Sequence, residues 1–376
     1  MKLNEFKLEN FFVNYEFTAP YLLTQSDCET MSVSEILAME PGSAEHFLNI
    51  RLGYTQKPGD PELRGLIAGL YKTMDASNIL ICCGAEEGIF AYMNTMLDAG
   101  DHMIVMSPGY QSSYEFAKQI PGCSYDNWYV REDGSKWTVD FDELEALIRP
   151  NTKLIAVNSP NNPTGFCFTN AEIRRLVAIC REHDLYLFAD EVYKGLELDG
   201  EKREWMADCY EKCVSLGVMS KAYGLPGLRI GWLAAKDSDL LYRMLQYKHF
   251  MSICNAAPSE FLSRIIIKHS DEVLEKSRSI IEKNLAYAHP FFERHRDIFL
   301  EKDLKAGPVT YHRLLLDMPI QEFTELAVNK KGVLLLPATI YGQTDVPCFR
   351  MGYGRKGFEL CLDKFEEFLY EQGFAK

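Results

Sequence analysis

Between residues 60 and 220, short apolar runs alternate with segments whose apolar residues recur at helical spacing. The apolar runs lack the strict alternation of a half-exposed strand, so they indicate strands buried on both faces. We predict these strands over residues 79–83, 103–106, 154–157, 185–189 and 214–219. Buried strands that alternate with helices predict a mostly parallel sheet with helices covering both faces.

The intervening helices are predicted from apolar spacing and from signals at their first residues. Asp60 and Pro61 form an N-cap and first turn ahead of a helical stripe of Leu63, Leu66, Ile67 and Leu70. Thr169 and Glu172 have the spacing of a capping box. Further helices are predicted over residues 85–97 and 111–118.

Beyond about residue 235, long charged helical stretches are followed by strand-like pieces at 311–316 and 333–336. We interpret this part as a second, smaller α+β domain to which the N-terminal arm is joined. A chain of 376 residues also exceeds what one hydrophobic core usually supports. The sequence therefore predicts three parts, an arm, a large three-layer α/β domain and a small domain, over 1–45, 46–250 and 251–376.

The composition, 47% apolar and 25% charged, is that of an ordinary globular enzyme. A net charge of −14 argues against nucleic acid as a partner. No apolar run reaches the roughly 18 residues of a membrane helix, and the N-terminus lacks the features of a signal peptide. The 11 cysteines show no metal-ligand spacing, so we expect free thiols, no metal site and a cytoplasmic location.

Candidate chemistry lies just past the carboxyl ends of the predicted strands. These positions hold a glycine turn, an aromatic residue, an amide-rich loop, an acid and a lysine: Gly84, Tyr110, 158–165, Asp190 and Lys221. Because the carboxyl ends of parallel strands meet at one edge of the sheet, where ligands bind, we expect one shared site.

Lys221 begins a loop broken by glycine and proline, and Arg229 follows within that loop. An amine that reacts near pH 7 needs burial or a neighbouring cation, and Arg229 suits that task and the binding of a phosphate. Gly84 begins a helix whose free N–H groups and dipole attract an anion. The dinucleotide and triphosphate motifs are missing, which disfavours a dehydrogenase.

Three further residues complete this candidate site. Asp190 ends a buried strand, where an unpaired carboxylate is costly, so a cationic partner is expected. Asn162 lies in a loop that prolines make rigid, and Tyr193 follows Asp190 closely.

The motifs Asn-Pro-Thr-Gly (162–165), Asp-Glu-Val-Tyr (190–193) and Ser-Lys-x2-Gly-x2-Gly-x-Arg-x-Gly (220–231) occur in this order. Tyr54-x4-Gly59-x3-Leu63-Arg64 precedes them, and Phe349-Arg350-Met351-Gly352 follows. Over nearly its whole length the chain thus resembles the class I and II aminotransferases, which are fold type I pyridoxal 5′-phosphate (PLP) enzymes.

This resemblance implies PLP as cofactor and assigns roles around its ring. Lys221 would form the Schiff base with the cofactor and move the substrate proton. Asp190 would pair with the pyridine nitrogen, and Asn162 and Tyr193 would bond the 3-oxygen. Tyr110 would stack on the ring.

The resemblance also implies residues for the phosphate, the substrate and a second subunit. The phosphate would be held by Arg229 and the helix start, with Gly84, Ala85, Glu86 and Ser220 as its neighbours. Arg350, with Asn162, would bind the substrate α-carboxylate. Tyr54 would reach the phosphate in the partner of a homodimer.

One position departs from the family pattern. Many relatives carry Ser or Thr three residues before the lysine as a phosphate ligand, and this chain has Val218. Whether the hydroxyl of Ser220 compensates stays open.

The resemblance implies a PLP-dependent aminotransferase that exchanges an amino group between an L-amino acid and a 2-oxo acid by a ping-pong mechanism. A lyase, replacement enzyme or cyclase on the same fold is the alternative, because the cofactor stabilises the same carbanion in each. A regulatory module without turnover is disfavoured, since Tyr54 already belongs to the enzyme pattern and leaves no room for a DNA-binding helix-turn-helix.

The donor amino acid is not determined by these motifs. No second arginine is assigned to a distal carboxylate. The aromatic-rich arm over 11–17 is expected to line the entrance of the site, because the N-terminal segment lies near the site in relatives. Glu16 would then favour a substrate with a basic side chain. Simple packing of the arm against the small domain is the interpretation we favour from sequence.

Overall fold

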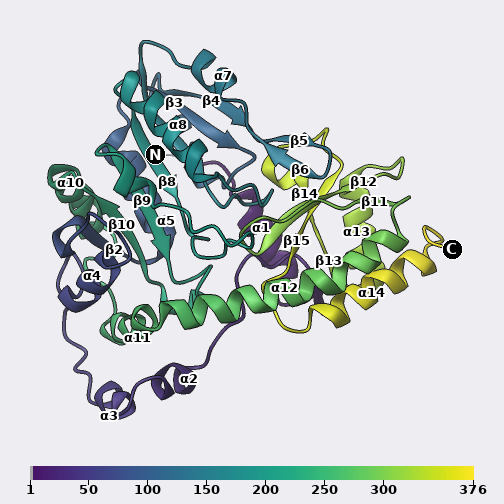
Figure 1. Ribbon diagram of the computed structural model, residues 1–376, viewed down its shortest axis with the longest axis horizontal. Coiled ribbons are helices and arrows are strands. Elements are labelled where there is room, and N and C mark those ends of the chain that lie inside the picture. The colour runs from purple at the N-terminus through teal and green to yellow at the C-terminus, as the bar shows by residue number, and fades with distance from the viewer. Residues whose placement is uncertain (1–2) are drawn as a thin grey trace.

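The computed structural model describes residues 3–376, and its larger part is built on one seven-stranded sheet (Figure 1). In spatial order the strands are β2 (Ile79–Cys82), β10 (Gly231–Ala235), β9 (Cys213–Val218), β8 (Tyr186–Asp190), β7 (Thr152–Asn158), β3 (His102–Ser107) and β4 (Ser124–Tyr129). The pairs from β9 to β4 are all parallel, and β10 runs antiparallel to both of its neighbours. The predicted mostly parallel sheet is confirmed.

Successive residues of the central strands enter two different cores, as expected of a sheet covered on both faces. Ile104 and Ile155 pack in the core that contains α8 (Asn170–Glu182). Their neighbours Met103 and Leu154 pack in the opposite core, with α5 (Gly84–Met96) and α10 (Ser238–His249). This arrangement gives the predicted three layers.

The predicted helix starts agree with the structure. Asp60 caps α4 (Pro61–Ala68) by accepting the N–H of Leu63 at 2.8 Å. Thr169 and Glu172 form the capping box of α8. The helix predicted over 111–118 is interrupted: α6 (Ser112–Glu115) is followed by a 3-10 turn over Ala117–Gln119, and the extended backbone of Ile120, the residue before Pro121, ends the helical stretch.

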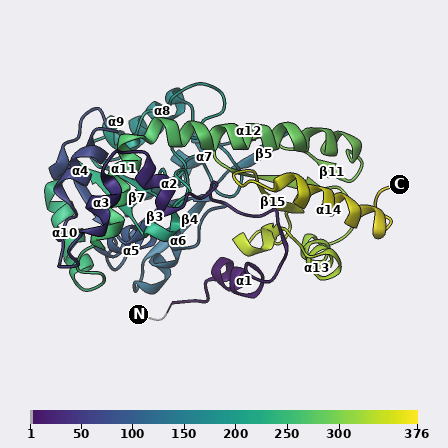
Figure 2. The same ribbon diagram turned by 90° about the horizontal axis from the view of Figure 1, so that it is seen from below.

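The smaller part contains a four-stranded antiparallel sheet of order β11-β12-β15-β14. Its strands are β11 (Phe299–Leu300), β12 (Val309–Leu314), β15 (Cys348–Gly352) and β14 (Leu336–Pro337). The helices beside it are α12 (Ser270–Arg294), α13 (Ile320–Lys331) and α14 (Phe358–Glu371). In Figures 1 and 2, α12 runs from the large part along the whole length of the smaller one.

The remaining helices are α1 (Lys7–Tyr15), α2 (Val33–Ala38), α3 (Ser43–Leu48), α7 (Phe141–Ala146), α9 (Met206–Cys209) and α11 (Ala257–Lys268). A hairpin is formed by β5 (Arg131–Asp133) and β6 (Lys136–Thr138). Within residues 3–376 no helix has both the length and the apolar character of a bilayer-spanning segment.

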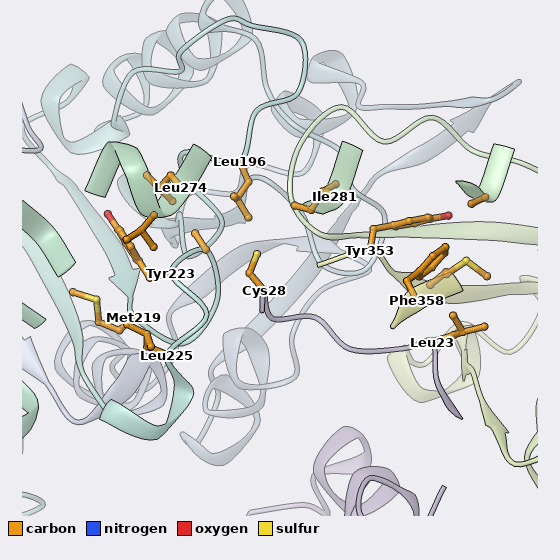
Figure 3. Packing of buried hydrophobic residues seen from close by; sticks show 14 of the residues in the cluster. Leu23, Cys28, Leu196, Met219, Tyr223, Leu225, Leu274, Ile281, Tyr353 and Phe358 are labelled. Atoms are coloured by element: carbon orange, nitrogen blue, oxygen red, sulfur yellow. The ribbon is translucent and has the colours of Figure 1, made fainter. Parts of the chain in front are cut away.

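The N-terminal arm is tied to the smaller part, because β1 (Tyr21–Leu22) pairs in parallel with β13 (Val333–Leu334). One core then continues from the arm into both parts of the chain. Figure 3 shows Cys28 of the arm between Tyr223 and Leu225 on one side and Tyr353 and Phe358 on the other. The domain boundaries at 45 and 250 stay a prediction.

The arm crosses β15 at Gly352, where no side chain can be accommodated. The Gly352 N–H donates to the carbonyl of Leu23 at 2.7 Å, and a Cβ at Gly352 would lie 1.9 Å from the carbonyl oxygen of Gln25. This crossing fixes the next arm residues, Ser26 and Asp27, beside the carboxyl edge of the large sheet.

Replacing Gly352 by alanine is expected to push the arm away and lower the free energy of unfolding by about 2 kcal/mol or more. The matched control is Gly65→Ala in α4, where a Cβ meets no atom within 4 Å and alanine favours the helix. Thermal unfolding should show a lower midpoint for Gly352→Ala and an equal or higher one for Gly65→Ala. Equal midpoints for both variants would contradict this account of the crossing.

Candidate active site

A cavity of about 390 Å³ lies at the carboxyl edge of the seven-stranded sheet. Nine of the twelve site residues predicted from sequence line it: Ala85, Glu86, Tyr110, Asn162, Asp190, Tyr193, Ser220, Lys221 and Arg229. A larger hollow of about 880 Å³ elsewhere on the molecule contains none of the twelve. The structure thus brings most of the predicted site together at the expected edge.

Asp190 is the buried acid of this cavity. It ends β8 opposite Asn158 of β7, whose side-chain amide donates to the Asp190 carbonyl at 3.1 Å. The Val192 N–H donates to the Asp190 carboxylate at 3.3 Å. Burial nevertheless raises the pKa of Asp190 to about 7, because the one hydrogen bond that the described residues donate to the carboxylate, from the Val192 N–H, does not replace the lost hydration. A cation brought to this carboxylate would restore its charge.

Lys221 follows β9 and extends into the same cavity. Its ammonium group Nζ donates to Ser26 Oγ at 2.9 Å. Desolvation lowers the pKa of Lys221, and the charge of Arg350 lowers it further, against the opposing charges of Asp27, Glu9 and Asp190. A lowered pKa increases the neutral fraction of the amine, which is the form that attacks a carbonyl.

The anion-binding end is formed by the first turn of α5 and the guanidinium of Arg229. Gly84 has φ of +80°, and a Cβ there would lie 2.5 Å from Arg229 Nη2. Arg229 itself has φ of +53°, a conformation that costs a non-glycine residue about 1 kcal/mol. Glycine at 84 therefore lets a cation lie directly over free backbone N–H groups, which suits a phosphate.

Val218 and Ser220 both line the cavity near this end. The hydroxyl of Ser220 is 3.5 Å from Arg229 Nη1, a long contact, and Arg229 Nη1 also donates to the carbonyl of Pro226 at 3.1 Å. An apolar side chain thus stands at position 218, as the sequence indicated.

Asn162 is linked to a buried network that the sequence did not predict in full. Tyr341 OH donates to Asn162 Oδ1 at 2.7 Å, and Arg350 Nη1 donates to Asn162 Oδ1 at 2.9 Å and to Tyr341 OH at 2.6 Å. Tyr193 is buried beside the cavity, and burial raises its pKa. The network holds the Asn162 side chain in one orientation.

Arg350, predicted to bind substrate, lies behind the cavity wall. The side chain is 0% exposed, and Nη2 donates to the carbonyl of Thr24 at 2.6 Å. Its Nε is buried and has no hydrogen-bond partner within the described residues. The guanidinium carbon lies 5.9 Å from the centre of the Phe12 ring, which does line the cavity.

The other two predicted residues also lie outside the lining. Gly84 contributes backbone at the start of α5, behind Arg229. Tyr54 is 85% exposed and does not line the cavity of its own chain, and the Lys57 ammonium lies 4.5 Å from its ring centre.

Several residues of the site come from the arm and from the chain end, where the sequence showed no motif. Ser26 holds Lys221, and Asp27 forms two hydrogen bonds with the guanidinium of Arg355, at 2.6 and 3.2 Å. Glu9 and Phe12 of α1 line the cavity opposite the sheet edge. In the sequence, only the aromatic-rich arm indicated that residues of this region lie near the site. Their exact positions could not be predicted, because they depend on the pairing of β1 with β13.

Residues 24–355 match the model of the family described as aminotransferase class I and II. The chain belongs to this family. Its cofactor is therefore PLP, and the predicted enzyme class, a PLP-dependent aminotransferase, is confirmed.

Individual relatives agree with this assignment. The chain is similar to aromatic-amino-acid aminotransferase 2 of Thermococcus litoralis, with 25% identity over 85% of this chain and 84% of the relative. It superimposes on a PLP-dependent aminotransferase from Streptococcus suis with a TM-score of 0.91, at 27% identity and 99% coverage of both chains. The PLP-dependent cyclase OrfR shares the fold, with a TM-score of 0.90 at 23% identity and coverage of 99% and 98%.

The residues of the cavity fit PLP at three points. Space at Gly84 below Arg229 suits a phosphate, the buried Asp190 lacks the cation that a protonated pyridine nitrogen provides, and Lys221 supplies an amine for the aldehyde. The fit extends to the loop side, where Asn162 and Tyr193 present hydrogen-bonding groups.

Asp190→Asn is expected to stabilise the cofactor-free protein while it reduces turnover by about 100-fold or more. An unfolded aspartate titrates near 3.8 and Asp190 in the fold near 7, so folding loses stability as the pH rises between these values. One pKa unit corresponds to about 1.4 kcal/mol, which gives a penalty on the order of 4 kcal/mol above pH 7.

Thermal unfolding of the cofactor-free proteins measures this effect. The midpoint gain of Asp190→Asn over the unmodified protein should be larger at pH 8 than at pH 5. A midpoint gain of Asp190→Asn that does not depend on pH, or a lower midpoint at pH 8, would show that burial of the Asp190 carboxylate does not destabilise the fold.

Proposed function

We propose that Lys221 and Asp190 carry out transamination between an L-amino acid and a 2-oxo acid in two half-reactions. The observation that carries this proposal is the shared cavity in which a lysine of lowered pKa and an aspartate of raised pKa lie at neighbouring strand ends. The lowered pKa of Lys221 favours the neutral amine that attacks an aldehyde, and the raised pKa of Asp190 marks a buried carboxylate that a cationic ring nitrogen would keep charged.

When bound, PLP supplies an electron sink that stabilises negative charge at the substrate Cα. Asp190 would keep the pyridine nitrogen protonated, and the ion pair would return its carboxylate to the charged form. Arg229, Ser220 and the backbone N–H groups of Ala85 and Glu86 would hold the phosphate end.

Lys221 then moves the proton from the substrate Cα. Ser26 Oγ accepts a hydrogen bond from Nζ and gives the amine a defined position in the cavity. Burial lowers the pKa of Lys221 and so increases the neutral fraction of the amine, which could accept the proton from the substrate Cα and deliver it to C4′ of the cofactor, two atoms away.

The ring oxygen and the substrate carboxylate are held from the loop side. Asn162 and Tyr193 would hold the 3-oxygen of the cofactor, and Tyr110 would pack on its ring. Arg350 binds the α-carboxylate after exchanging its contact with the Thr24 carbonyl, while Tyr341 keeps the other side of the guanidinium fixed. Helix α1 reduces the access of water to this end of the cavity.

We further propose a cytoplasmic homodimer in which Tyr54 completes the phosphate site of the partner. Leu48, Leu52 and Phe250 are each more than 80% exposed, and the Thr55 hydroxyl donates to the carbonyl of Asn255 at 2.9 Å, which links the two segments. An exposed apolar surface of this kind is typical of a subunit interface.

A second candidate is a lyase, replacement or cyclisation reaction on an amino acid. The cyclase OrfR shares the fold, and the same cavity groups serve each of these reactions. Formation of product without a 2-oxo acid acceptor would favour this candidate.

Lys221→Ala is expected to abolish both the visible absorption of the lysine-bound cofactor and the turnover, because no other lysine within residues 3–376 lines the cavity. Lys136→Ala, at an exposed position of β6, is the control and should retain both. Absorption spectra and oxo-acid formation measure the two effects. Normal absorption and turnover in Lys221→Ala would overturn the assignment.

Mixed dimers test the role of Tyr54. Tyr54→Ala and Lys221→Ala variants, each impaired alone, should regain activity when their subunits are exchanged, because one site of the mixed dimer then contains both native residues. The activity of the mixture should exceed the sum of the two variants measured separately. A simple sum, with subunit exchange verified by native mass spectrometry, would show that Tyr54 does not act across the interface.

A further inference from the structure

Helix α1 places two carboxylates in the catalytic cavity. Glu9 lies inside the helix, and Glu16 caps its end, where its backbone N–H donates to the carbonyl of Phe12 at 2.8 Å. Both residues line the cavity, together with Phe12. Seven residues correspond to two helical turns, about 10 Å, so Glu9 and Glu16 lie on one face of α1.

Glu9 lies close to side chains that are assigned to the cofactor. Tyr110 OH donates to Glu9 Oε1 at 3.0 Å. The charge of Glu9 partly opposes the burial that lowers the pKa of Lys221, and it adds to the burial that raises the pKa of Glu86. Glu9 therefore faces the space between the lysine and the start of α5, where the substrate is transformed.

The charges that line the cavity do not balance. Among the residues that the structure describes, five acids and three cations line it: Glu9, Glu16, Asp27, Glu86, Asp190, Lys221, Arg229 and Arg355. Asp27 and Arg355 neutralise each other, and Asp190, Lys221 and Arg229 are assigned to the cofactor. Glu86 accepts a hydrogen bond from the Ser112 hydroxyl at 2.5 Å, and burial raises its pKa.

Glu9 and Glu16 are left without a cationic partner. No ion pair in the described part of the chain includes either residue. A substrate with a distal carboxylate would bring a further negative charge beside them, and all three cations of the lining are already engaged.

The orientation of the substrate follows from Arg350. Its buried Nε lacks a hydrogen-bond partner in the described residues, and its guanidinium lies against Phe12, between Glu9 and Glu16 along the helix. An α-carboxylate bound at Arg350 leaves the side chain of the amino acid to extend past Phe12 towards the two carboxylates.

We propose that Glu9 and Glu16 form an anionic subsite that selects an amino donor with a cationic distal group, an ammonium or a guanidinium. This inference rests on the proposed function only in that an amino acid binds in the cavity with its carboxylate at Arg350. It assigns α1 a part in substrate selection in addition to its packing.

Matched pairs of amino acids test the subsite on the holoenzyme. Lysine is compared with norleucine, which lacks only the ammonium, and arginine with citrulline, its uncharged counterpart. Titration of the visible cofactor absorption gives an apparent Kd for each. The cationic member of at least one pair should bind about 10-fold tighter or more, because charge-assisted hydrogen bonds are the stronger ones.

Glu9→Gln and Glu16→Gln keep the size of the side chain and remove its charge. At least one of them should weaken binding of the cationic donor about 10-fold, and neither should change the affinity for norleucine or citrulline by more than about 2-fold. Glu45→Gln, at an exposed position of α3, is the control and should behave as the unmodified enzyme. Thermal unfolding midpoints verify that each variant is folded.

Two results would overturn the proposal: equal affinity for the charged and uncharged members of both pairs, or an equal loss for both members in the glutamine variants. Preference for lysine alone or arginine alone identifies the ammonium or the guanidinium as the recognised group.

Product analysis with and without a 2-oxo acid separates this proposal from the proposed reaction. Donor binding precedes the chemical step, so the two proposals can fail separately. If the enzyme selects cationic donors but forms product without an acceptor, the subsite proposal stands and the proposed transamination is overturned. If the enzyme is an active transaminase without charge selectivity, only the subsite proposal is overturned.

Discussion

The burial of one carboxylate, that of Asp190, is the constraint on which the rest of the site depends. At the end of β8 the side chain is removed from water, and its pKa rises to about 7 because one hydrogen bond from the backbone does not replace hydration. Such an unfavourable group is tolerated in a fold when another interaction offsets the free energy of its desolvation. In the proposed function a protonated pyridine nitrogen provides that interaction, and Lys221 and Arg229 line the same cavity, where they would meet the other two ends of the cofactor.

The large sheet alone does not complete the site. The arm crosses β15 at Gly352, and only this crossing brings Ser26 to the Lys221 ammonium and Asp27 to Arg355. Arg350 is held from the same side, by the carbonyl of Thr24 and by Tyr341. The proposed cofactor end of the cavity is thus built from one sheet edge, and the proposed substrate end is built from segments near both ends of the chain.

The sequence predicted those parts that depend on local pattern. Buried strands read as apolar runs, so Asp190 and Lys221 were located by the strands that they follow. The strand β4 was missed because it lies at the sheet edge and carries polar residues, and its sequence lacks an apolar run. Glu9, Ser26 and Tyr341 could not be predicted, since their places depend on how distant segments pack. Arg350 was found through the family motif, yet its burial behind Phe12 follows only from the tertiary structure.

The identity of the cofactor lysine is the central claim, and the chain offers a second buried lysine for comparison. Lys248 is 0% exposed, but its Nζ donates to the carbonyls of Lys57 and Ile81 and to Asn255 Oδ1, which engages all three N–H groups. Lys221 Nζ has a single such partner in the described residues, Ser26, and lines the cavity. Borohydride reduction of the holoenzyme followed by peptide mass spectrometry identifies the lysine that carries the cofactor. We expect modification of Lys221 alone, and a cofactor attached to Lys248 or to any surface lysine would overturn the assignment of Lys221.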